Sequence, residues 1–389
     1  MLGLCQNMDF VPQQVRNASV KYHVNAPSLG VFIFKSNHNL FVHNCMHRLA
    51  TFPPELLSEI FSHLQQLPLT FYFVTSYVRI RINHRYAERN KSIRALSQTC
   101  RALKDVLQPW VWQRLDCCFM PETARSTWHN YAMENLQRKA EGMKSMPVEI
   151  QRNVRIITII LSTHRVAETF PALRGLLEAL PQLQTIHVLK CDSPVLFSKA
   201  LNGLLIPTVK TLVTPTETAK GLTLACPNTT HIRCAGGVGG SVVQGLKSVK
   251  KCQILDGTID WVTDLKLVDR LVENAPSTLH TLEICKRENR RLGIHNVAPA
   301  QWVQVIPKLS RMKGLRKLIL TFPKSEEEPS DVASVNAAKE LMKGLASSSR
   351  AATMLIVRCT ITPHSSHQLS EEDYAFSEDV FVFNLYVNC

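Results

Sequence analysis

The sequence predicts an α/β protein in two parts: a small all-helical region followed by a longer region in which short strands alternate with helices. Apolar residues recur at helical spacing between residues 56 and 64 and again between residues 93 and 107. From about Val154 onward, short β-branched runs alternate with helical stretches instead. The chain has 389 residues, of which 45% are hydrophobic and 20% charged, so it can form the cores of two or three domains.

Residues 1–50 show no sustained hydrophobic period, and we interpret them as an N-terminal leader for which disorder is an open alternative. Organised sequence begins at Thr51, a helix N-cap residue that precedes two prolines and Glu55 in the first turn. The helix predicted there carries a wide apolar stripe made of Leu56, Leu57, Ile60, Phe61 and Leu64. A second helix is expected from Ser92 to Leu107, ended by Pro109.

These two blocks, FPPELLSEIFSHL and SIRALSQTCRALKDVLQPWVWQRL, together resemble the F-box. The resemblance covers about forty residues, and it implies a helical module that docks on a Skp-type adaptor and through it on a cullin. By resemblance, the adaptor would be contacted by Pro54, Leu56, Ile60, Phe61, Leu64, Ile93, Leu96 and Trp112.

The two blocks are normally only a few residues apart, but here residues 65–90 intervene. This insertion is either a genuine loop or a translated intron that does not belong to the protein. We therefore expect an F-box-like domain at residues 51–116 with an insertion at 65–90. A helical connector is expected at residues 117–150, because Met133, Leu136, Ala140 and Met143 form a weak helical stripe there.

Residues 151–389 contain recurring short strands, separated first by about 20–25 residues and later by about 30–40. The expected strands are 156–161, 185–189, 211–213, 231–233, 252–255, 282–284, 318–320, 354–357 and a last one within 381–387. This spacing resembles an irregular leucine-rich repeat, which implies a solenoid of stacked strand–helix units. The regular asparagine ladder of such repeats is missing, and an ordinary α/β domain is the alternative. The predicted fold is therefore a small all-α F-box-like domain followed by an irregular leucine-rich-repeat-like solenoid.

The two resemblances imply a substrate-recognition adaptor of an SCF-type (Skp–cullin–F-box) ubiquitin ligase that holds an unidentified target protein on its repeat domain. The alternative function is a leucine-rich-repeat interaction scaffold with a degenerate F-box and no role in ubiquitination. We do not expect an enzyme, a metal or a cofactor. Residues 240–248 miss the phosphate-binding pattern G-x-x-x-x-G-K-[ST] by one extra residue, Leu246, and no cysteine pair has zinc spacing.

The formal net charge is +14, but the basic excess is spread along the chain, so nucleic acid is not an expected partner. Two basic clusters are candidates for binding an acidic or phosphorylated peptide. Within them we select Lys286, Arg287, Arg290, Arg291, Arg311 and Arg316 as partner-binding residues. The twelve cysteines are interpreted as buried reduced thiols, and no stretch reaches the ~20 apolar residues of a membrane span. A soluble protein of the cytoplasm, the nucleus or both is expected.

Overall fold

The structure is a computed structural model of the chain. It describes residues 52–53, 55–57, 59, 84–118, 128–235, 238–257, 265–285, 304–323, 329–349, 353–360 and 381–383. The chain divides into two compact units, residues 1–48 and 49–389, and all of the described residues lie in the second.

A ten-stranded sheet organises this second unit, and its strands lie side by side in the order in which they occur in the chain. The first nine strands are parallel, whereas β10 pairs antiparallel with β9. The strands are β1 (Arg114–Cys117), β2 (Ile156–Leu161), β3 (Thr185–Cys191), β4 (Thr211–Pro215), β5 (His231–Ala235), β6 (Ile254–Gly257), β7 (Thr281–Cys285), β8 (Lys317–Pro323), β9 (Met354–Thr360) and β10 (Phe381–Phe383).

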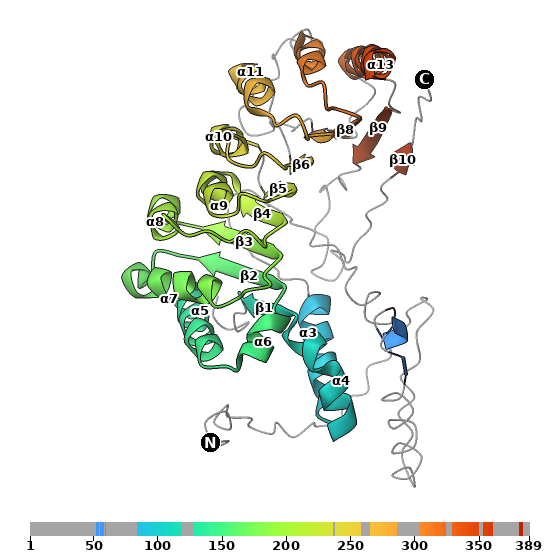
Figure 1. The fold of residues 1–389 in the computed structure, drawn as a ribbon. Helices are drawn as coiled ribbons and strands as arrows, with labels where there is room; N and C mark the ends of the chain where they lie inside the picture. The colour runs from blue at the N-terminus through green and yellow to red at the C-terminus, as the bar shows by residue number, and fades with distance from the viewer. Residues whose placement is uncertain are drawn as a thin grey trace, which may run out of the picture. The chain divides into compact units, whose positions relative to one another are not determined.

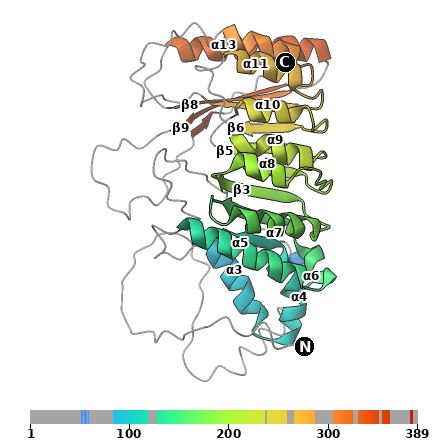
Figure 2. The same ribbon diagram turned by 90° about the vertical axis from the view of Figure 1, so that its left-hand side faces the viewer.

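Helices precede the sheet and connect its parallel strands, and Figures 1 and 2 show a row of them stacked along one side of the sheet. The helices before β1 are α3 (His84–Ser97) and α4 (Arg101–Trp112). The connecting helices are α5 (Trp128–Lys144), α6 (Val148–Asn153), α7 (Val166–Glu178), α8 (Pro194–Ala200), η1 (Thr216–Thr218), α9 (Ala219–Ala225), α10 (Gly240–Leu246), α11 (Leu265–Asn274), η2 (Ile306–Arg311) and α13 (Pro329–Ser349).

Alternate residues of each strand point toward these helices and form the core, because successive side chains of a strand lie on opposite faces of the sheet. In β2, for example, Ile157, Ile159 and Leu161 are all fully buried against helix residues. The core has two clusters, one under α5, α7 and α8 and one under α10, α11, η2 and α13. In the first cluster, the rings of Phe170 and Phe197 pack edge to face, with their centroids 5.9 Å apart.

The helix expected from Ser92 to Leu107 is two helices, so that prediction was wrong. The chain leaves α3 after Ser97, whose hydroxyl donates to the carbonyl oxygen of Arg94, and the Thr99 hydroxyl donates likewise to Leu96. Such hydroxyl groups compete with the backbone at a helix end. Pro109 lies inside α4 rather than ending it, since Leu107 before it is fully buried and Trp112 beyond it packs on the core.

The predicted fold class was also wrong. The structure is an α/β arrangement in which helices flank a sheet with nine parallel strands, not an all-α domain followed by a leucine-rich-repeat-like solenoid. The strand that overturns the prediction is β1, which follows α4 directly and pairs in parallel with β2. Because β1 lies within the predicted F-box-like domain, that domain contributes the first strand of the sheet.

The individual strand predictions were confirmed, since each of the nine expected segments overlaps a strand, from β2 to β10. The stripe expected at 117–150 was confirmed too: Met133, Leu136, Ala140 and Met143 are all buried. They lie on α5, which packs against α7, β1 and β2. Among the described residues, no helix is both long and apolar enough to cross a membrane.

Candidate functional site

The residues predicted to bind an adaptor fall into three groups in the structure. Pro54, Ile60, Phe61 and Leu64 lie outside the described residues. Leu56 lies in a helical turn at residues 55–57 and is 52% exposed, whereas its neighbour Leu57 is buried. On the α3–α4 pair, Leu96 and Trp112 are half-buried, but Ile93 is only 2% exposed and so offers no surface to a partner.

The face of the sheet that points away from the helices, called the sheet face below, carries a row of mostly polar residues at the same level of six adjacent strands. The row consists of Asp116, Thr158, His187, Val213, Arg233 and Asp256. Sequence reasoning missed it because its residues are far apart in the chain. Only the strand register brings them together.

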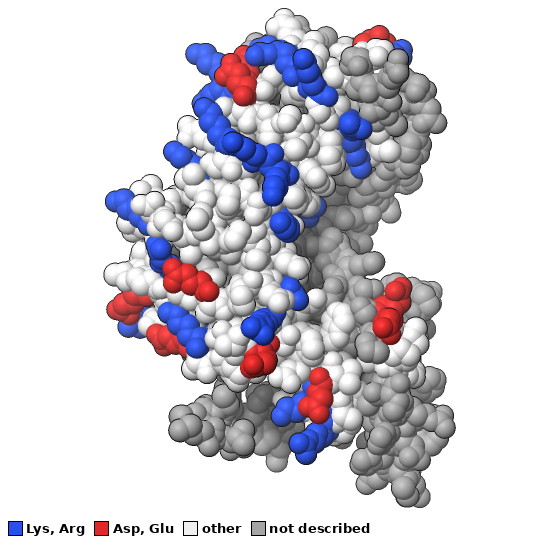
Figure 3. Space-filling model, viewed as in Figure 1, with Lys and Arg blue, Asp and Glu red and all other residues white. Residues whose placement is uncertain are grey.

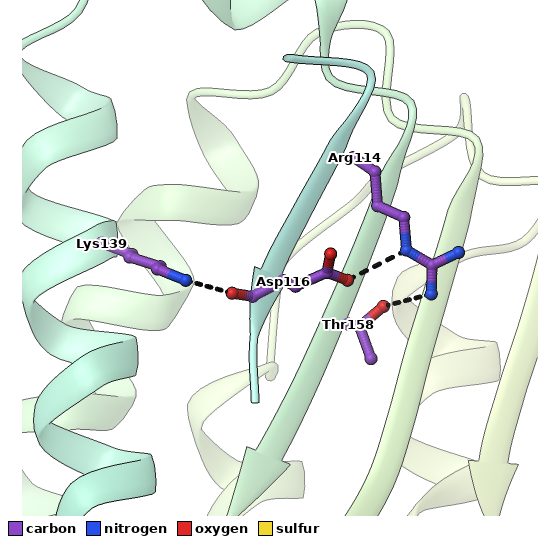
Figure 4. Close-up of polar contacts among 4 residues, drawn as sticks. All are labelled: Arg114, Asp116, Lys139 and Thr158. Carbon is purple, nitrogen blue, oxygen red and sulfur yellow. Dashed lines mark hydrogen bonds and ion pairs between the residues drawn. The ribbon is translucent and has the colours of Figure 1, made fainter. Parts of the chain in front are cut away.

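Charged groups in this row are paired with one another. Arg114 Nε donates to Asp116 Oδ1 at 2.9 Å, and Arg114 Nη2 donates to Thr158 Oγ1 at 3.0 Å (Figure 4). From α5, the Lys139 ammonium donates to the carbonyl oxygen of Asp116. Farther along the row, Arg233 Nε lies 2.5 Å from Asp256 Oδ2. These contacts satisfy the charges within the chain itself.

Burial governs the titration of the sheet face. Burial is the main cause, with the nearby cations Arg114 and Arg233, of the lowering of the pKa of His187 to about 3. Burial also lowers the pKa of Arg114 to about 10, although the Asp116 carboxylate opposes this. At neutral pH the imidazole is therefore uncharged and the guanidinium is charged. A neutral histidine between two arginines is a poor general base, so the geometry favours a structural or binding role for this face over catalysis.

Metal ligands and cysteine thiols of the described residues were the remaining candidates for chemistry. The described residues contain no group of three or more His, Cys, Asp or Glu side chains placed to bind a metal. Burial raises the pKa of the Cys117 and Cys226 thiols to about 12, so they are protonated at neutral pH. The phosphate-loop near miss is the helix α10, in which a β-carbon on Gly245 would collide with the Thr223 hydroxyl. That glycine allows α9 and α10 to approach closely.

Of the residues predicted to bind a partner peptide, Arg311 and Arg316 are exposed, whereas Lys286, Arg287, Arg290 and Arg291 lie outside the described residues. Three exposed lysines from another loop carry the same charge, and the sequence analysis did not select them: Lys247, Lys250 and Lys251. The signal for them was the short run K-S-V-K-K, which follows α10 and contains no acidic residue. Lys313 completes the exposed set.

Comparison with known protein families gives no family model that matches the chain, and comparison with curated proteins gives no match. The function therefore has to be argued from the residues and their arrangement.

Proposed function

We propose that the protein is the substrate-recognition subunit of an SCF-type ubiquitin ligase, and that it is not itself an enzyme. Its N-terminal helices would dock on a Skp-type adaptor, and its sheet and loops would hold a target protein. Such a receptor acts by raising the concentration of the target near a ubiquitin-charged enzyme, so it needs no catalytic side chain. The proposal places it in the cytoplasm, the nucleus or both.

Exposure of Leu56 supports the docking half of the proposal. The backbone N–H groups of Leu56 and Leu57 both donate to the Pro53 carbonyl oxygen, at 3.0 and 3.2 Å, which forms the helical turn. The turn directs Leu57 into the protein and leaves Leu56 half in solvent. An exposed leucine beside a buried one can insert into an apolar groove of a partner with little loss of conformational entropy, because the backbone is already ordered.

The direct junction between α4 and β1 is the observation that carries the proposal. Only Gln113 separates the two elements, and its carbonyl oxygen accepts from the N–H groups of Arg155 and Ile156, at 2.8 and 3.1 Å. In addition, Trp112 packs on the core beneath the first strands. Because no flexible linker separates the docking helices from the sheet, the sheet keeps a fixed orientation relative to a bound adaptor. A fixed orientation is what a receptor needs if it is to raise the effective concentration of its target at the enzyme.

The proposal is tested by co-precipitation of the full-length chain with a purified Skp-type adaptor. We expect Leu56→Asp to abolish binding, because it puts a charge into the apolar contact. Leu205→Asp is the matched control, since Leu205 is 70% exposed in the loop between α8 and β4, away from the predicted hook. Binding that survives Leu56→Asp, or an adaptor that binds neither variant nor the unsubstituted chain, contradicts the proposal.

A second candidate is an interaction scaffold that works without an adaptor. The observation in its favour is the start of α3 at His84, inside the 65–90 segment that separates the two F-box-like blocks. The family pattern has no such extension. A folded chain that captures a target from cell extract but never the adaptor would favour this candidate.

A further inference from the structure

A group of exposed cations lies at the ends of three neighbouring units, where the chain passes from a helix into the next strand. We call these cations the basic edge: Lys247, Lys250, Lys251, Arg311, Lys313 and Arg316. They come from the α10–β6 loop, from the last residue of η2 and from the η2–β8 loop. The α11–β7 loop lies between these two loops. The α10–β6, α11–β7 and η2–β8 loops contain no acidic residue. Figure 3 shows mostly Lys and Arg side chains over the α10 and α11 region, with acidic side chains among them at the level of α11, whereas lower down acidic side chains are more frequent.

The cations of the basic edge have no counter-charge within the described part of the chain, where none of the six forms an ion pair. The neighbouring Lys308 differs, because its ammonium lies 3.0 Å from Asp269 Oδ2. Six like charges held on two loops at one edge of the sheet repel one another and attract anions.

An open pocket of about 420 Å³ lies among these loops, lined by Gln253, Ser277, Thr278, His280, Gly314 and Arg316. The Ser277 hydroxyl, the Gln253 amide and the Arg316 guanidinium belong to its lining, which contains no carboxylate. Such a set of donors suits the oxygens of a phosphate or a carboxylate.

The loops around the pocket contact one another directly. The Thr278 hydroxyl lies 2.7 Å from the Cys252 carbonyl oxygen and 3.0 Å from that of Lys250, and so ties the α11–β7 loop to the α10–β6 loop. On the other side, a β-carbon on Gly314 would collide with the Ser277 carbonyl oxygen, so the glycine allows the two loops to touch. A pocket formed in advance loses less entropy when it binds a ligand.

We propose that the basic edge binds an anionic segment of a partner protein, with a phosphorylated or acidic side chain seated in the pocket beside Arg316. Strands β6 and β8 are two positions apart, which separates their loops by about 10 Å, the length of three residues of extended chain. Two or three clustered anionic side chains can therefore meet Lys250, Arg316 and Lys313 together. The inference rests on the proposed function only in identifying the partner as the target of the ligase.

The composition of the loops favours a protein over a nucleic acid. Proteins that bind single strands stack bases on aromatic side chains. The three loops contain no Phe, Tyr or Trp, and their cations span only three strands. They can match a short run of anionic side chains, but they offer no platform for bases.

The test measures fluorescence anisotropy of labelled peptides with the full-length protein and no adaptor present, so its result is independent of F-box activity. One probe is an eight-residue peptide of alternating Glu and Ser, and the other has one central serine phosphorylated. We expect both to bind at low salt and to be released by about 0.5 M NaCl, which shortens the screening length to a few ångströms. Tighter binding of the phosphorylated peptide assigns phosphate to the pocket, and equal binding assigns carboxylate.

The double variant Lys250→Glu/Arg316→Glu should weaken binding about tenfold or more, since two contacts become repulsive and tenfold corresponds to 1.4 kcal/mol. The matched control is Lys220→Glu/Lys266→Glu, with the same charge change at exposed positions near the opposite ends of the strands. Equal losses in the two variants would reduce the effect to net charge and overturn the proposal. Tighter binding of a twelve-residue oligothymidine than of either peptide would overturn it in favour of nucleic acid. The unsubstituted chain and both double variants should give the same circular dichroism spectrum.

Discussion

The sheet face and the basic edge use charged residues in opposite ways. On the sheet face, Arg114 contacts Asp116 of its own strand, and both side chains are largely shielded from water. Arg233 contacts Asp256 of the neighbouring strand, with 43% and 21% of these side chains exposed. On the basic edge, within the described residues, the cations stand exposed and without ion pairs. The sheet face thus pairs its charges within the chain, whereas the basic edge leaves its charges open to the partner proposed above. Matched substitutions in the two regions test whether this difference is real.

The largest expected effect is that of Asp116→Ala. The Asp116 side chain is 2% exposed and that of Arg114 10%, so the substitution leaves a buried guanidinium without its carboxylate. We expect the free energy of unfolding to fall by about 3 kcal/mol, measured by urea denaturation at pH 7. The control is Asp269→Ala beside the basic edge, whose ion pair with Lys308 is about 40% exposed and should contribute less than about 1 kcal/mol. Equal losses would abolish the distinction between the two regions.

A smaller effect is expected from pH. The pKa of His187 is about 3 in the folded chain and 6.5 for a free side chain. Between these values the unfolded chain binds a proton that the folded chain excludes, so stability decreases as the pH falls below 6.5. The contribution reaches about 2 kcal/mol at pH 5. The variant His187→Leu should therefore lose less stability between pH 7.5 and pH 5 than the unsubstituted chain. Identical pH profiles in urea denaturation would show that His187 does not titrate as described.

The smallest effects separate a paired arginine from an unpaired lysine at the surface. Arg174 donates to Glu178 on α7 at 3.0 Å and to the carbonyl oxygen of Asn202 at 2.8 Å, so Arg174→Gln should cost about 1 kcal/mol. In contrast, Lys250→Gln should change the free energy of unfolding by less than about 0.5 kcal/mol. A larger loss for Lys250→Gln in thermal denaturation would mean that Lys250 serves the fold rather than a partner.

Local patterns predicted the strands well because each strand carries its own signal. Runs such as residues 156–161 and 318–320 are β-branched or apolar throughout, as expected for strands of a parallel sheet that is buried on both faces. The exception was β1, whose sequence Arg-Leu-Asp-Cys alternates charged and apolar residues over only four positions. Its charges are stabilised by a partner, Thr158, that lies 44 residues away from Arg114. Without β1, the sequence analysis predicted an all-α domain where the chain already contributes a strand to the sheet, and this led to the wrong fold class.

The candidate sites were predicted less completely. The F-box resemblance selected Leu56, which is exposed, but also Ile93, which the fold buries. Charge clustering along the chain selected Arg311 and Arg316, and the run K-S-V-K-K around Lys250 carried a signal of the same kind that was not used. Only the order of the strands shows that the two clusters lie on one edge of the sheet. A pattern within one segment therefore predicts an element, whereas a surface shared by three segments needs the sheet topology.

Sequential strand order has a geometric consequence for any receptor built on this chain. Because neighbouring strands are about 4.8 Å apart, the pocket near β7 lies about 30 Å along the sheet from the junction of α4 with β1. Adding or deleting one strand–helix unit between them would move a bound target by about 5 Å relative to the N-terminal helices. In the receptor proposed above, the number of units would therefore determine which lysines of a target come within reach of a transferring enzyme.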